Sequence, residues 1–347
     1  MAQGHPRGAN FSRRTVSPGR QPNSMRRRLR ESFVKPLITA LSPLCISVNE
    51  IIGNVKLGKQ TEQRNTLKVV FNFALYLSKV TLENKTILFK NGRVSFTVSG
   101  KGRAVVLLHG FLGAKEIWKN TIENLSKSYR VVAIDLPGHG ATDNFGYAHS
   151  MELMAKCVKV VMDSLSLRKY VLVGHSMGGY AALSFTELFP EHVKGLCLFQ
   201  STTYADSDEK KKDRLRAIRL VKANRSLYTR TTIQNLFADK NLKYLKQEIV
   251  FANSFARRTS RRGIIAALHG MRDREAKDKL LKSTDFPWMF VIGEHDKALQ
   301  PATVLEQADK VKNKFVLYLE HDGHYGLLES PRQSNKALRK FLRKCYR

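Results

Sequence analysis

Cysteine is scarce in this sequence, and none of it is spaced as disulfide frameworks or metal sites require. The 347 residues include four cysteines, Cys45, Cys157, Cys197 and Cys345, with no C-x-x-C pair among them. This pattern argues against a disulfide framework and against a zinc site. Cys157 and Cys197 lie in apolar runs, where a thiol behaves as a small buried hydrophobe. We therefore expect a reducing compartment and a cytoplasmic location.

Acidic residues are also few compared with basic ones. The chain carries 60 Lys and Arg against 29 Asp and Glu, a formal net charge of +31. The first 30 residues contain eight Arg, no acidic residue and few apolar ones. Because such a segment buries too little surface to offset its ordering entropy, we predict that 1–30 is disordered. The net charge raises nucleic acid, anionic membranes and acidic substrates as partners without choosing among them.

The N-terminal region lacks an uninterrupted hydrophobic run. The apolar stretch 33–46 has 14 residues and is broken by one Lys and two Pro. It is too short to span a bilayer, so we predict no transmembrane segment. The basic start resembles a transit peptide or a secretory signal, although no A-x-A cleavage site follows. Residues 1–85 are therefore targeting sequence, a basic and largely disordered accessory extension, or an upstream extension without a folding role.

From residue 86 the sequence alternates between strand-like and helix-like patterns. The runs 86–90 and 94–98 flank Asn91-Gly92, the strongest short signal of a β-hairpin. Most later strands are continuous apolar runs, as in a sheet covered on both faces. The alternation predicts an α/β fold, with a mostly parallel sheet and helices on both faces. Strands are expected at 104–108, 131–134, 170–173, 193–199, 288–292 and 315–319, and helices near 116–128, 150–166, 177–189, 302–311 and 331–345.

One connection in this pattern is unusually long. Between Ser201 and Asp285 no strong strand run occurs, whereas helical patterns cover 208–224 and 241–255. A connection of this length is too long for a simple crossover between two strands. We predict an inserted helical subdomain at about 201–285. It carries 21 Lys and Arg against 10 Asp and Glu, a net charge of +11.

The main chemical motif is Gly174-His175-Ser176-Met177-Gly178, between a predicted strand and a predicted helix. A serine on a sharp strand-to-helix turn exposes its hydroxyl above the sheet, and the flanking glycines avoid collisions with neighbouring backbone. The helix N-terminus adds partial positive charge beneath a developing negative charge. The alternative is a glycine-rich turn that only permits close packing. The context favours Ser176 as a nucleophile.

A serine nucleophile needs a base, and the base needs an acid that orients it. Asp296 follows the predicted strand 288–292, and His324 follows the predicted strand 315–319. Because the carboxyl ends of parallel strands share one edge, Ser176, Asp296 and His324 can converge there. The competitors for the acid and base roles lie in the same two loops: Glu294, His295, His321 and Asp322.

A second loop carries candidate oxyanion donors. The strand 104–108 runs into His109-Gly110-Phe111-Leu112-Gly113, a loop punctuated by glycine. We predict that the backbone N–H groups of Phe111 and Met177 form an oxyanion hole. Losing one such donor costs about 2.7–4 kcal/mol of transition-state stabilisation. His109 is expected to fix the loop by hydrogen bonding and not to take part in catalysis.

Residues 86–347 resemble the α/β-hydrolase superfamily, in particular its lid-bearing branch of small esterases, lactonases, proline iminopeptidases and carbon–carbon bond hydrolases. The resemblance implies that Ser176, Asp296 and His324 form a catalytic triad and that 201–285 is a cap over the active site. Ala141-Thr142 stands where the branch often has a small residue and Ser, and Thr keeps the hydroxyl. Residues 1–85 match nothing in the family. The features that carry the resemblance are His109-Gly110-Phe111, Asp135–Gly140, Gly174–Gly178, Gly293–Asp296 and Gly323-His324.

The resemblance implies a serine hydrolase that cleaves an ester-like bond of a small molecule through an acyl-enzyme, without a metal or an organic cofactor. A carbon–carbon bond hydrolase or lyase with the same triad and a non-catalytic ligand-binding relative stay open as alternatives. The cluster Arg257-Arg258-Thr-Ser-Arg261-Arg262 supports nucleic-acid binding, but no recognition motif accompanies it, so we expect no specific nucleic-acid partner. The basic cap favours an anionic substrate, although solvated helix faces explain its charge equally well. The oligomeric state is left open.

Overall fold

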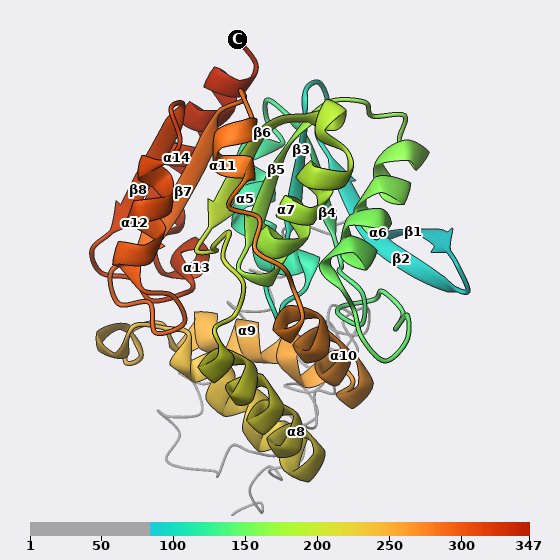
Figure 1. Cartoon of the computed structure of the whole chain (residues 1–347), viewed down its shortest axis with the longest axis vertical. Helices are drawn as coiled ribbons and strands as arrows, with labels where there is room; N and C mark the ends of the chain where they lie inside the picture. The colour runs from blue at the N-terminus through green and yellow to red at the C-terminus, as the bar shows by residue number, and fades with distance from the viewer. Residues whose placement is uncertain (1–83) are drawn as a thin grey trace, which may run out of the picture. The chain divides into compact units, whose positions relative to one another are not determined.

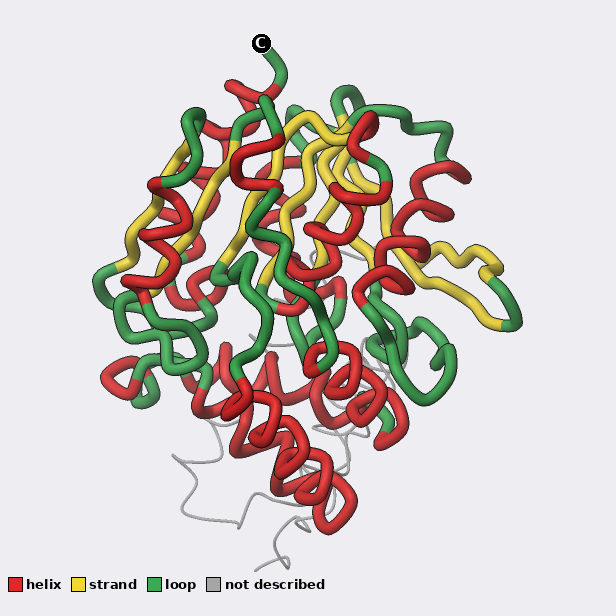
Figure 2. Tube along the Cα trace, in the orientation of Figure 1, coloured by secondary structure: helices red, strands yellow, loops and turns green. Residues whose placement is uncertain are grey.

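A computed structural model describes residues 84–347, and the predictions made for residues 1–83 lie outside this range. Within it, a sheet of eight strands forms the centre, in the order β1-β2-β4-β3-β5-β6-β7-β8 (Figures 1 and 2). β2 pairs antiparallel with β1 and β4, and all other neighbours pair parallel. The predicted α/β fold with a mostly parallel sheet is confirmed. The strands are β1 (Asn84–Phe89), β2 (Gly92–Ser99), β3 (Ala104–Leu108), β4 (Arg130–Ile134), β5 (Tyr170–His175), β6 (Val193–Phe199), β7 (Trp288–Gly293) and β8 (Lys314–Leu319).

Helices cover both faces of the sheet, with α6 packed against α7 and α5 packed against α14 (Figure 1). Ser150 caps α6 and Ser260 caps α10, because each hydroxyl accepts a backbone N–H from the first helical turn. No helix in residues 84–347 is both long and apolar enough to cross a bilayer. The helical elements are η3 (Lys115–Trp118), α5 (Lys119–Leu125), α6 (Met151–Ser164), α7 (Met177–Leu188), η4 (Pro190–His192), α8 (Asp208–Asn235), η5 (Asp239–Asn241), α9 (Lys246–Arg258), α10 (Arg261–Arg272), α11 (Leu280–Ser283), α12 (Pro301–Asp309), α13 (Gly326–Glu329) and α14 (Pro331–Cys345).

The core lies along the middle strands. Every residue of β3 and β5 is buried, since these strands have neighbours on both sides and helices on both faces. β8, at the edge of the sheet, alternates between exposed and half-buried residues until its last position. Its apolar pattern therefore predicted more burial than an edge strand receives.

The hairpin predicted from Asn91-Gly92 has its turn one residue earlier. Phe89 pairs with Gly92, so Lys90 and Asn91 make the turn, and Lys90 adopts a φ of 51°. Gly92 belongs to β2, where an added Cβ would lie 2.8 Å from the ring of Phe145. This glycine therefore permits the close approach of a loop instead of supplying the turn.

The connection between β6 and β7 contains the inserted helices. Figure 1 shows α8, α9 and α10 together at one end of the sheet, and α8 packs against both of the others. The predicted helix 208–224 continues to Asn235 across a kink at Asn224, whose φ of −149° and ψ of 88° are not helical. Helix α10, in which Arg261 and Arg262 form the first turn, was not predicted. We use the word cap for residues 208–272, the helical part of the insertion predicted at about 201–285, and its position over an active site stays a prediction.

Candidate active site

Ser176 occupies the turn between β5 and α7. Its φ of 50° and ψ of −116° lie in a region that residues with a Cβ rarely adopt, so the surrounding backbone must hold it. The Ser176 N–H donates to the Phe199 carbonyl at 3.0 Å, and the Ser201 hydroxyl donates to the Ser176 carbonyl at 2.8 Å. An added Cβ on Gly178 would collide with the Leu108 carbonyl. The turn therefore needs glycine for close packing, as its sequence predicts.

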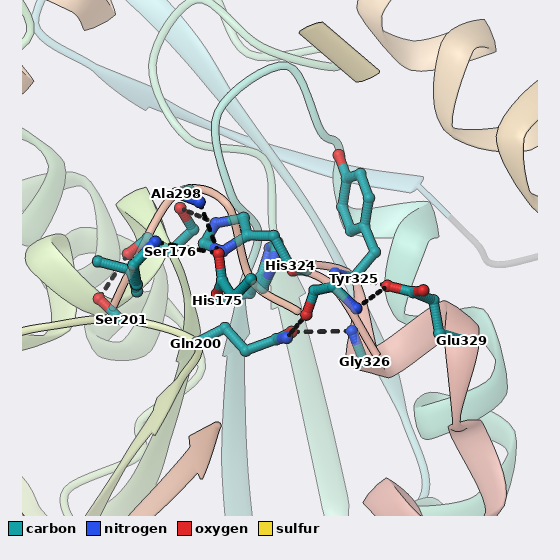
Figure 3. A network of polar contacts seen from close by, with 12 residues as sticks. His175, Ser176, Gln200, Ser201, Ala298, His324, Tyr325, Gly326 and Glu329 are labelled. Carbon is teal, nitrogen blue, oxygen red and sulfur yellow. Dashed lines mark hydrogen bonds and ion pairs between the residues drawn. The ribbon is translucent and has the colours of Figure 1, made fainter. Parts of the chain in front are cut away.

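The structure brings Ser176, His324 and Asp296 together. His324 Nε2 lies 2.8 Å from Ser176 Oγ (Figure 3). His324 Nδ1 lies 2.7 Å from Asp296 Oδ2. Because an ionised carboxylate only accepts hydrogen bonds, Nδ1 carries the proton and Nε2 accepts from the serine hydroxyl. The hydroxyl thus faces a base that is already held in the tautomer needed to remove its proton.

Asp296 is fixed by its own turn. Its Oδ1 accepts the N–H groups of Ala298 at 2.8 Å and Leu299 at 3.0 Å, which leaves Oδ2 for the imidazole. Glu294 and His295, its neighbours, are exposed, and His295 Nε2 lies 2.7 Å from the Lys240 ammonium. Asp296 is therefore the carboxylate of this loop that reaches His324.

The two competitors in the histidine loop are also separated from the triad. The His321 imidazole is exposed and contacts the Lys240 ammonium at 3.2 Å. Asp322 is buried and accepts from the Ser330 hydroxyl at 2.9 Å, and burial raises the pKa of its carboxyl to about 6. Among residues 84–347, no hydrogen bond joins either side chain to His324 or to Ser176.

Residues that the sequence did not single out hold the histidine loop. The Gly326 N–H donates to Gln200 Oε1 at 2.8 Å, while Gln200 Nε2 donates to the Gly323 carbonyl. His175 Nε2 donates to the His324 carbonyl at 2.8 Å (Figure 3). These contacts join residues more than 120 positions apart, so no local pattern could have indicated them.

His175, the second residue of the serine motif, is neutral at ordinary pH. It is enclosed between the rings of Tyr325, at 5.3 Å, and His324, at 5.1 Å. Burial lowers the pKa of its imidazole to about 3, and the neighbouring His324 acts in the same direction. A neutral His175 supports the His324 backbone without placing a positive charge beside the base.

The loop that carries Phe111 is fixed by His109. The Leu136 N–H donates to His109 Nε2 at 2.9 Å, so His109 Nδ1 carries the proton and donates to the Gly110 carbonyl at 2.8 Å. Burial lowers the pKa of His109, which keeps this arrangement neutral. Within residues 84–347, neither the Phe111 N–H nor the Met177 N–H donates to a backbone carbonyl outside helices and strands. Their use as an oxyanion hole stays a prediction.

The motif Asp135–Gly140 supports the same loop. The Thr142 hydroxyl donates to the Asp135 carbonyl at 2.7 Å and accepts the Ser95 N–H at 2.8 Å. This is a role that needs a hydroxyl but not a serine. The departure from the family pattern at Ala141-Thr142 therefore leaves the local structure intact.

Comparison with known proteins places this chain in a family. The model of the alpha/beta hydrolase fold matches residues 103–331. The dihydrolipoyllysine-residue acetyltransferase component of the acetoin cleaving system of Pseudomonas putida is 30% identical over 256 residues, 72% of this chain and 66% of that protein. The 2-hydroxy-6-oxononadienedioate/2-hydroxy-6-oxononatrienedioate hydrolase of Escherichia coli is 37% identical over 120 residues, 33% of this chain and 42% of that protein. The chain thus spans less than two thirds of these relatives.

Solved structures agree with this placement. A thermophilic esterase from Thermogutta terrifontis superimposes with a TM-score of 0.72 and 26% identity, covering 76% of this chain and all of that one. The enol-lactonase from Burkholderia xenovorans shares the fold with a TM-score of 0.70 and 17% identity, covering 75% of this chain and all of that one. From the matching family model and these folds, the chain belongs to the α/β-hydrolase family.

Proposed function

We propose that this protein is a serine hydrolase that cleaves an ester-like bond of a small molecule. The observation that carries the proposal is the continuous relay from Ser176 Oγ to His324 at 2.8 Å and from His324 to Asp296 at 2.7 Å. Chains of this kind activate a serine by removing its proton as it attacks. The strained backbone of Ser176 supports the same role, since strain of this kind clusters at functional sites.

The mechanism follows from these positions. His324 Nε2 removes the hydroxyl proton while Ser176 Oγ attacks the carbonyl carbon of the substrate. The N–H groups of Phe111 and Met177 stabilise the oxyanion, and Asp296 stabilises the imidazolium. His324 then protonates the leaving alcohol, which leaves an acyl group on Ser176. A water molecule, activated by the same imidazole, releases the acid.

Hydrolysis of p-nitrophenyl acetate and labelling by a fluorophosphonate probe test this proposal together. We expect Ser176→Ala to lower kcat/KM by about 10³-fold or more and to abolish labelling. Ser128→Ala changes an exposed serine at a distance from the site and serves as the matched control. Undiminished turnover by Ser176→Ala would remove the basis of the proposal.

A carbon–carbon bond hydrolase with the same triad is the second candidate. It is favoured by the 37% identity to the Escherichia coli hydrolase, which acts on a dienedioate. The two candidates differ in substrate, not in the residues used. A vinylogous diketone carboxylate and a matched p-nitrophenyl ester, each assayed with wild type and Ser176→Ala, separate them by which substrate gives the larger kcat/KM.

We further propose that the substrate is anionic. Residues 201–285 carry a net charge of +11, and a positive surface raises the local concentration of anions. The p-nitrophenyl monoester of succinate should therefore be preferred to the uncharged p-nitrophenyl butyrate, by a factor that decreases as salt is added. Equal kcat/KM values that do not respond to salt would contradict this part of the proposal.

A further inference from the structure

One carboxylate, that of Glu329 at the end of α13, accepts hydrogen bonds from the backbone of the residues before and after His324. Glu329 Oε1 accepts the Gly323 N–H at 2.8 Å and the Tyr325 N–H at 3.3 Å. The two donors immediately precede and follow His324 in the chain. The carboxylate therefore holds the peptide group that precedes Gly323 and the peptide group between His324 and Tyr325, and Figure 3 shows Glu329 beside Tyr325.

The second oxygen of the same carboxylate binds the segment that leaves the cap helix α8. Glu329 Oε2 accepts the Ala238 N–H at 3.1 Å and the Asn241 Nδ2 at 2.8 Å. Asn241 also donates to the His321 carbonyl at 2.8 Å. Glu329 is thus shared between the histidine loop and the segment Ala238–Asn241.

The histidine loop and the segment that follows α8 are also in direct contact. The His324 N–H donates to the carbonyl of Leu236 at 2.7 Å. An added Cβ on Gly323 would lie 2.7 Å from the backbone carbon of Phe237, so glycine is needed for this close approach. The end of α8 therefore rests on the backbone of the histidine loop, and Glu329 joins the two by four hydrogen bonds.

We propose that Glu329 is a positioning residue that couples the seating of the cap segment Leu236–Asn241 to the orientation of His324. The inference rests on the proposed function, because it assigns Glu329 to the base of that reaction. A carboxylate suits the role, since its two oxygens accept on both sides at once. When the cap segment is seated, His324 is held at Ser176. When it lifts, the carboxylate and the Leu236 carbonyl lose their partners together, and the imidazole loses its alignment.

The coupling predicts a distinctive kinetic change. Glu329→Ala removes the hydrogen bonds that the carboxylate accepts from the histidine loop and from the cap segment. It leaves Ser176 and the N–H groups of Phe111 and Met177 in place. A small displacement of a catalytic group lowers the rate by up to about 10²-fold. We therefore expect kcat for p-nitrophenyl acetate to fall about 10- to 100-fold, with KM changed by less than about threefold.

Two variants separate positioning from general stability. Glu329→Gln keeps one accepting oxygen and replaces the other by an NH₂ donor, so it can retain the hydrogen bonds of one side. We therefore expect a smaller loss of kcat than in Glu329→Ala. Glu320→Ala removes an exposed carboxylate nearby and should leave kcat unchanged. Thermal melting of each variant shows whether it is folded.

A double-substitution cycle with His324→Ala decides the route of the effect. If Glu329 acts through His324, Glu329→Ala has little further effect on the residual rate of His324→Ala. An equal loss in both backgrounds, a change confined to KM, or an unchanged kcat in a folded Glu329→Ala variant would overturn the coupling.

A spectroscopic measurement keeps this test independent of the proposed reaction. The proton between His324 Nδ1 and Asp296 is followed by NMR and assigned by its absence in His324→Ala. We expect its resonance to shift or broaden in Glu329→Ala and to stay unchanged in Glu320→Ala. If the wild-type protein hydrolyses no ester, the proposed function fails, whereas this resonance still supports or refutes the role of Glu329.

Discussion

The Lys115 ammonium lies 2.5 Å from Oδ2 of Asp135, and neither side chain has any exposed surface. The ammonium also donates to the Ser95 hydroxyl at 3.0 Å, and Asp135 Oδ1 accepts the Lys115 N–H at 2.7 Å. Lys115 follows the loop of Phe111, and Asp135 follows β4. The pair therefore ties the proposed oxyanion loop to the sheet.

Replacing one member of this pair should be strongly destabilising. Lys115→Met leaves the buried Asp135 carboxylate without its counter-charge, and breaking a buried pair in this way costs about 3–5 kcal/mol. In Lys115→Met/Asp135→Asn the uncompensated charge is gone, so the free energy of unfolding should recover in part. Urea unfolding of both variants measures this, with Lys127→Met as an exposed control. A loss below about 1 kcal/mol in the single variant would contradict the assignment.

Asp296→Asn should inactivate the protein without unfolding it. Asn can still accept the Ala298 and Leu299 N–H groups through its oxygen, but its amide nitrogen then faces His324 Nδ1. A donor at this position favours the wrong imidazole tautomer, a change that lowers kcat by about 10⁴-fold. Steady-state kinetics and thermal melting measure the two effects separately. Glu294→Gln, at an exposed position in the same loop, is expected to retain full activity.

Stability should decrease as the pH falls below about 6.5, in part because of His139. Burial lowers the pKa of this imidazole from 6.5 to about 3 in the folded chain. Between these values the unfolded chain binds a proton that the folded chain does not, so its contribution is present above pH 6.5 and is lost as the pH falls through this window. His139→Asn keeps a donor to the Pro137 carbonyl and removes the titration. Its melting temperature should depend less steeply on pH than that of the wild type, and an equally steep dependence would contradict this prediction.

The convergence of Ser176, Asp296 and His324 could be predicted because each depends on a local feature at the end of a strand. A glycine-flanked turn marks the first, and loops after two apolar runs mark the others. Parallel pairing then brings the strand ends to one edge. The order of the strands was not needed for this prediction. The catalytic roles of the three residues stay predictions.

The supporting contacts could not be predicted, since they depend on the packing of distant segments. Gln200 follows β6 and reaches Gly323 across 123 positions. The role of Glu329 could not be predicted, because it depends on the end of α8 lying beside the histidine loop. Helix α10 did carry a signal, since Ser260 caps it by accepting the Gly263 N–H at 3.0 Å. The Arg261-Arg262 pair that follows Ser260 forms the first turn of this helix, although its charge alone predicts only a basic cluster.

The base of the cap should open when Asp206 is replaced. Asp206 lies before α8 and binds Arg274, beyond α10, at 2.7 Å and Arg214 at 3.0 Å, so one carboxylate joins both ends of the cap. Burial alone raises the pKa of Asp206, but the two guanidinium charges outweigh it and hold that pKa below its usual value. The contribution of this carboxylate is therefore present at neutral pH and is lost as the pH falls through its folded value.

Asp206→Asn mimics that loss at neutral pH and leaves the Arg274 guanidinium buried without its counter-charge, which costs about 3–5 kcal/mol. The ion pairs of Asp206 with Arg214 and Arg274 lie where the inserted helices begin and end. We therefore expect hydrogen exchange to accelerate in residues 208–272 more than in β3 and β5. Asp208→Asn, at an exposed position two residues later, should leave exchange unchanged. If exchange accelerated equally in the sheet and in the cap, Asp206 would stabilise the whole domain, and the prediction of a local effect on the cap would be wrong.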